Sequence, residues 1–102
     1  MAKLKITVIK KFSPHEVFGH EITRDTGEPI SSCYLEKGQE FIVENHLTVP
    51  DEFCAQAWQD IYNSILLYYY NGDYRYPEPN VTYIPCDDGI RPVIFKIERL
   101  NP

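Results

Sequence analysis

The sequence lacks several features that would place it in a broad functional class. No apolar run approaches the roughly 18 residues of a membrane-spanning helix, and no glycine-rich phosphate loop, HExxH motif or Ser-His-Asp order is present. Basic residues are also few: 10 lysines and arginines stand against 15 acidic residues, so the net charge is −5. An acidic chain is a poor match for the phosphate backbone of nucleic acids. We therefore expect neither membrane insertion nor nucleic-acid binding.

Cysteine is scarce as well, and its count and spacing are informative. The chain has 3 cysteines, an odd number, and none of them forms a C-x-x-C pair. The first residues, MAKLKITVIKKF, lack the unbroken apolar core of a signal peptide, so we expect a cytoplasmic protein. Thiols stay reduced in that compartment, and an odd count also argues against a disulfide framework.

One stretch, Thr48 to Gly72, has the pattern of a long amphipathic helix. Its apolar residues recur at intervals of three and four, which is the period of a helix with one buried face. The threonine that opens it can cap the helix, Pro50 is tolerated in a first turn, and Asn71-Gly72 supplies a stop. We expect the helix to run from Asp51 to Tyr70, with Cys54 in its first turn.

Four shorter stretches alternate apolar and polar residues with the period of a half-buried strand. They are Leu4 to Phe12, Gln39 to Glu44, Val81 to Ile84 and Pro92 to Arg99. A turn signal, Asp87-Asp88-Gly89, predicts a hairpin between the last two. Four mainly antiparallel strands packed against one long helix predict a single two-layer α+β domain over residues 1–102. The expected core comprises Ile6, Val8, Phe41, Trp58, Ile61, Ile65, Phe95 and Ile97.

The chain resembles a family of small uncharacterised bacterial proteins, many of them from anaerobes. Four phrases carry the likeness, LKITVIKKFSP, EKGQEFIVEN, FCAQAWQDIY and CDDGIRPVIFKIERL, and it is weakest between Leu66 and Thr82. The family's pattern has one cysteine before the GQEF strand, one at the helix start and an adjacent pair before the DG-RPV turn. These positions correspond to Cys33, Cys54 and Pro85-Cys86, so Pro85 replaces the first member of the pair. The resemblance implies a common role for the cysteines but no particular activity.

The three cysteines are the candidate site. Cys33 precedes a predicted strand, Cys54 lies at the helix start and Cys86 follows a strand, and such element ends can meet at one edge of a two-layer fold. Thiolates ligate zinc and iron–sulfur clusters, and a helix N-terminus favours the thiolate form. We therefore expect these three residues to bind zinc or an iron–sulfur cluster, with redox chemistry as a related use. The alternative is that each is a small buried hydrophobic residue.

Three thiolates need a fourth ligand or an open coordination position. The candidates in the sequence are His15, His20, His46 and Asp87, beside an exogenous molecule. Loop histidines more often face solvent, and a DDG run is first of all a turn former. Arg91 could bind a carboxylate or phosphate, but its simpler role is an ion pair with the aspartates of the turn.

Two other functions stay open. A dense tyrosine group could form the surface of a homo-oligomer or of a cofactor-free binding or assembly module, because tyrosine combines apolar area with a polar tip. Its members are Tyr68, Tyr69, Tyr70, Tyr74 and Tyr76. Cys54 could instead be the nucleophile of an enzyme, although no base lies near it in the sequence. The sequence leaves open whether the protein is an enzyme and which small molecule it would bind.

Overall fold

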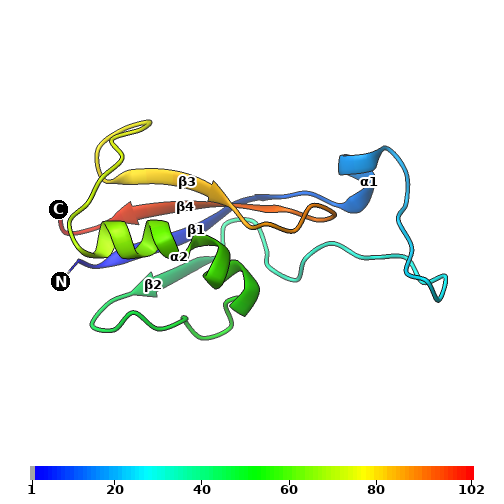
Figure 1. Ribbon diagram of the computed structural model, residues 1–102, viewed down its shortest axis with the longest axis horizontal. Helices are drawn as coiled ribbons and strands as arrows, with labels where there is room; N and C mark the ends of the chain where they lie inside the picture. Colours follow the sequence, from blue (N-terminus) through cyan, green and yellow to red (C-terminus); the bar gives the residue numbers. More distant parts are fainter. Residues whose placement is uncertain (1) are drawn as a thin grey trace.

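The fold is a four-stranded antiparallel sheet with one helix packed along one face, as the sequence predicts (Figure 1). The computed structural model describes residues 2–102. The elements in chain order are β1 (Leu4–Lys11), α1 (Pro14–Phe18), β2 (Glu40–Val43), α2 (Ala55–Tyr69), β3 (Val81–Pro85) and β4 (Val93–Arg99). The strands lie side by side in the order β2-β1-β4-β3, and all three pairings are antiparallel. Among residues 2–102, no helix is long and apolar enough to cross a membrane.

The core lies between α2 and the face of the sheet that this helix covers. Alternate residues of β1 and β4 point into it, which is the period of a strand with one buried face. They are Leu4, Ile6 and Val8 from β1, and Val93, Phe95 and Ile97 from β4. All the predicted core residues are buried except Trp58, which is half-buried. The ring of Trp58 lies at the border of the core, edge-on to Phe53 at 6.4 Å and to Tyr62 at 5.6 Å between centroids.

The helix is shorter at its start than the sequence predicts. It has 15 residues, and Cys54 is its N-cap instead of a residue of its first turn. The preceding residues form a turn in which the N–H of Phe53 donates to the carbonyl of Pro50 at 3.1 Å. Glu52 in that turn has a φ of 68°, which a right-handed helix does not include. The acidic pair at 51–52 therefore precedes the helix, and Thr48 does not cap it.

The helix ends close to the predicted position. Glycine stands at position 72 for a steric reason and not because its backbone is left-handed. The left-handed residue is Asn71, with a φ of 70°, and not Gly72. The N–H of Gly72 donates to the carbonyl of Leu67 at 2.7 Å. A Cβ atom on Gly72 would lie 2.5 Å from the side chain of Leu67 and 2.8 Å from its carbonyl oxygen. Glycine is required here because the backbone passes so close to the helix.

The short helix α1 is absent from the predicted elements. It begins with a capping box: the hydroxyl of Ser13 accepts from the N–H of Glu16 at 3.1 Å, and the carboxylate of Glu16 accepts from the N–H of Ser13 at 2.9 Å. The S-x-x-E signature is visible in the sequence, but no periodic apolar run follows it. Beyond α1 the chain forms an extended arm that returns to the sheet before β2 (Figure 1).

Candidate functional site

The three cysteines line one cavity at the N-terminal end of α2. Cys33 lies in the segment that leads into β2, Cys54 caps α2 and Cys86 directly follows β3. All three are free and half-buried, and the cavity has a volume of about 240 Å³. The structure therefore brings together three residues that lie far apart in the sequence.

Main-chain contacts hold each cysteine in place. The sulfur of Cys54 accepts from the N–H of Ala57 at 3.5 Å, as an N-cap side chain does. The sulfur of Cys86 accepts from the N–H of Val93 at 3.4 Å, and the two residues also share a backbone hydrogen bond of 3.0 Å that closes the β3–β4 hairpin. The carbonyl of Cys33 accepts from Nζ of Lys11 at 3.0 Å. The segment before β2, a helix end and a hairpin thus each deliver one thiol to the cavity.

The remaining walls divide into an apolar part and a polar part. The buried lining residues are apolar: Leu35, Ala57, Val93 and Phe95. The more exposed ones carry hydroxyl, amide or charged groups: Ser31, Ser32, Tyr34, Gln56, Asp88 and Arg91. A ligand in this cavity would therefore meet sulfur and hydrocarbon in its depth, and charge near its opening.

Asp88 and Arg91 form the charged part of the opening. Oδ1 of Asp88 accepts from the N–H groups of Ile90 at 2.9 Å and Arg91 at 3.1 Å, and Oδ2 lies 3.4 Å from Nε of Arg91. Burial alone would raise the pKa of Asp88, but these N–H donors and the guanidinium outweigh it and hold the pKa below its ordinary value. Asp88 is therefore a carboxylate at neutral pH. Nη1 of Arg91 also donates to the carbonyl of Ser31 at 3.1 Å, which ties the hairpin turn to the segment before Cys33.

Tyr34 is a further titratable residue of the cavity wall, beside the cysteines, Asp88 and Arg91. Its pKa is raised chiefly by partial burial, and the charges of Cys54 and Cys33 add to the effect. The phenol is therefore protonated at neutral pH, and it donates to the carbonyl of Glu52 at 3.2 Å. This contact joins the segment that carries Cys33 to the turn that precedes α2.

None of the fourth ligands expected from the sequence lines the cavity. The three histidines, His15, His20 and His46, are exposed and stand elsewhere. Asp87 is held outside it, because its carboxylate accepts from Nε2 of Gln56 at 3.0 Å and its N–H donates to the carboxylate of Asp60 at 3.0 Å. The neighbouring Asp88 lines the cavity instead. It forms an ion pair with Arg91, which is the simpler role that the sequence predicts for this arginine.

The donor set suits a soft metal, but its side chains border the same cavity without meeting at one point. Three thiols and one carboxylate are ligands that zinc and iron–sulfur clusters accept. Across residues 2–102, however, no three side chains of His, Cys, Asp or Glu stand where they could hold a metal ion. A metal would therefore require the cysteine side chains to turn inward from the positions seen here.

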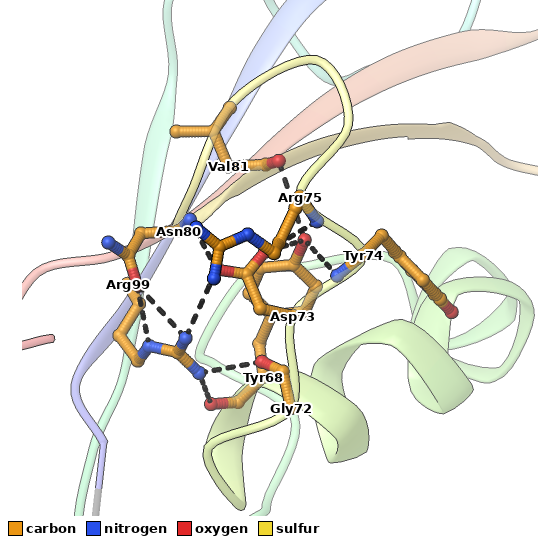
Figure 2. Close-up of polar contacts among 8 residues, drawn as sticks. All are labelled: Tyr68, Gly72, Asp73, Tyr74, Arg75, Asn80, Val81 and Arg99. Atoms are coloured by element: carbon orange, nitrogen blue, oxygen red, sulfur yellow. Dashed lines mark hydrogen bonds and ion pairs between the residues drawn. The ribbon is translucent and has the colours of Figure 1, made fainter.

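A second polar cluster lies at the opposite end of α2 (Figure 2). Arg99, whose side chain is only 7% exposed, pairs with Asp73 at 3.5 Å and donates twice to Oδ1 of Asn80, at 2.9 and 3.1 Å. The hydroxyl of Tyr68 donates to Asp73 at 3.1 Å. In the described part of the chain, no buried side-chain nitrogen or oxygen lacks a partner. Its groups therefore satisfy one another, and the cluster anchors the loop after α2.

The tyrosine group divides between the core and the surface. Tyr68 and Tyr69 are buried in the core, whereas Tyr70 is 56%, Tyr74 54% and Tyr76 80% exposed. The two buried rings therefore belong to the core of one chain. The exposed ones lie after the helix and at its last turn.

Comparison with known proteins adds no assignment: no protein-family model, no curated protein and no solved structure matches the chain. The function has to be argued from the cavity itself.

Proposed function

We propose that this protein binds a soft metal ion or an iron–sulfur cluster through Cys33, Cys54 and Cys86. The observation that carries the proposal is their convergence on one cavity from three separate segments. Cysteines that served only as small hydrophobic residues could be scattered through the core, and packing alone does not explain why all three border the same space. A reducing compartment, for which the cytoplasm is the natural choice, would keep these thiols available.

The environment of the sulfurs supports metal ligation. Two of them, on Cys54 and Cys86, accept backbone N–H groups, and such contacts orient thiolate ligands and stabilise their charge. A cysteine side chain has one torsion with three staggered positions. Inward rotation about that torsion can draw the sulfurs toward the cavity without a change of fold, and it exchanges the present N–H contacts of Cys54 and Cys86 for metal bonds. Zinc–sulfur bonds of about 2.3 Å require such a rotation.

The test is the metal content of protein purified without oxygen. We expect bound zinc or iron in the unaltered protein, and a visible absorption band if a cluster is present. Cys33→Ser, Cys54→Ser and Cys86→Ser should each bind far less metal, while Ser64→Ala, a change in α2 away from the cavity, should not. A metal-free protein that also takes up neither zinc nor reconstituted iron and sulfide would refute the proposal.

We propose as a second property that the protein forms a homo-oligomer, or a cofactor-free assembly, through its exposed tyrosines. The observation that favours it is the exposure of three rings at or after the end of α2, Tyr70, Tyr74 and Tyr76. Tyrosine is enriched at protein interfaces. Tyr70→Ser and Tyr76→Ser together should lower the mass seen by light scattering. A monomer before and after the change would exclude association through these rings.

A further inference from the structure

We infer that Asp88 is the fourth ligand of the three-cysteine site, so that a bound divalent metal would have three sulfur donors and one carboxylate oxygen. The inference rests on the proposed function and names the residue that completes its coordination. It differs from the expectation that a histidine, Asp87 or an exogenous molecule would do so.

The composition of the cavity leaves one candidate. Among the lining residues of the described range, 2–102, Asp88 is the only aspartate, glutamate or histidine. It is also two residues from Cys86 in the same hairpin turn, so the two side chains reach the cavity from one short segment. Carboxylate oxygens bind zinc at about 2.0–2.2 Å and are common partners of sulfur and nitrogen ligands.

The hydrogen bonds of Asp88 orient one oxygen and leave the other available. Oδ1 is occupied by the two backbone N–H groups of Ile90 and Arg91, at 2.9 and 3.1 Å. Oδ2 has one contact, to Nε of Arg91 at 3.4 Å, which is long for a charge-assisted hydrogen bond. Carboxylates that ligate metals are held in this manner by outer contacts that fix their direction. Oδ2 is therefore the atom that would bind the metal.

Charge balance gives Arg91 a part in the same site. Three thiolates and a carboxylate carry four negative charges, and a divalent metal neutralises two of them. Two negative charges then remain, and the guanidinium of Arg91, already paired with Asp88, compensates one of them. Partial neutralisation matters because uncompensated charge in a half-buried site is costly.

The experiment compares cobalt(II) and zinc(II) binding in three proteins: the unaltered chain, Asp88→Asn and Asp87→Asn. Asparagine at 88 can still accept the two N–H groups through its side-chain oxygen, so the turn is kept while the charged ligand is lost. Asp87→Asn is the matched control, because this neighbouring carboxylate lies outside the cavity. We expect Asp88→Asn to weaken metal binding by at least the roughly tenfold that loss of an outer contact of a ligand costs and to shift the visible cobalt spectrum, and Asp87→Asn to change neither.

The outcomes separate this inference from the proposed function. If Asp88→Asn binds cobalt with unaltered affinity and spectrum while the cysteine variants do not bind it, Asp88 is not a ligand and the thiolate site stands. If the unaltered protein binds no metal, both are wrong. Should Asp88→Asn fail to fold, X-ray absorption of the zinc-loaded unaltered protein decides. Three sulfurs at about 2.3 Å with one oxygen at about 2.0–2.2 Å support the inference, and a shell of sulfur alone overturns it.

Discussion

Nη1 of Arg99, in the last strand, lies 2.7 Å from the carbonyl oxygen of Tyr68 in the last turn of α2 (Figure 2). The same nitrogen donates to the carbonyl of Gly72 at 2.8 Å. The final carbonyl groups of a helix have no partner within the helix, and a cation near them also complements the helix dipole. The last turn of α2 contains no basic residue of its own. An arginine from the sheet therefore fulfils the role that a lysine or arginine in the helix usually has.

Arg99→Ala should be among the most destabilising changes in the chain. It would leave the carbonyls of Tyr68 and Gly72 without the guanidinium and the half-buried carboxylate of Asp73 without its cation. Losing one member of a buried pair costs roughly 3–5 kcal/mol. Urea unfolding followed by circular dichroism measures the loss. Arg75→Ala is the control in the same loop, since Arg75 is exposed and should change stability by less than about 0.5 kcal/mol. Equal effects of the two changes would contradict the anchoring role.

The stability of the protein should depend on the ionisation of Asp73. The N–H of Asn80 is the largest cause that lowers the pKa of Asp73, and the N–H of Arg75, the hydroxyl of Tyr68 and the charge of Arg99 add to it. Because the pKa is lower in the folded than in the unfolded state, this stabilisation is present above the unfolded pKa, about 4. It is lost as the pH falls through the folded value.

Asp73→Asn tests this dependence. The difference in unfolding free energy between the unaltered protein and Asp73→Asn should be constant at neutral pH and should shrink below pH of about 4. Urea titrations at a series of pH values measure it. A difference that stays the same down to pH 2 would mean that hydrogen bonding by the neutral side chain, and not its charge, holds the loop.

The sheet and the helix face could be predicted because each has a local periodic signal. The alternation in β1 and β4 and the turn residues between β3 and β4 gave the strands and their hairpin. The start of α2 could not be predicted in the same way. Pro50 is compatible both with a first helical turn and with the separate turn that precedes α2, and the choice depends on the positive φ of Glu52. This torsion depends on the tertiary structure, and nothing in the sequence indicates a positive φ for a glutamate.

The sequence indicated that the three cysteines could meet at one site. It did not indicate which other residues form the walls of the cavity. Cys33, Cys54 and Cys86 each stand at an element end, and element ends can meet at a sheet edge. Ser31 and Tyr34 belong to the long segment without periodicity, so nothing in the sequence places them at the cavity. Which of the adjacent aspartates, 87 or 88, lines the cavity depends on the side chain that the turn directs inward. Because both residues are aspartate, the sequence does not distinguish them.

Gly72→Ala should destabilise the protein, and Gly89→Ala should not. Neither glycine has a positive φ, so alanine is compatible with both backbones. A Cβ at 72 would lie 2.8 Å from a carbonyl oxygen of the helix, whereas at 89 it would meet nothing within 4 Å. Overpacking of this kind costs about 1–3 kcal/mol, and the loss of chain flexibility at 89 could even stabilise. Thermal unfolding of the two variants measures the contrast, and similar midpoints would show that the backbone at 72 yields without cost.

Cys54 has two roles in this account, as helix cap and as metal ligand, and two substitutions separate them. In metal-free protein, Cys54→Ser should be neutral or slightly stabilising, because serine is a better N-cap than most residues, while Cys54→Ala should cost about 1 kcal/mol. With zinc present, the unaltered protein should gain stability in proportion to metal binding, and both variants should lose that gain because neither offers a thiolate. Thermal unfolding with chelator and with zinc gives the four comparisons. If zinc stabilises Cys54→Ser as much as the unaltered protein, the sulfur of Cys54 does not ligate, and its contact with Ala57 is its whole function.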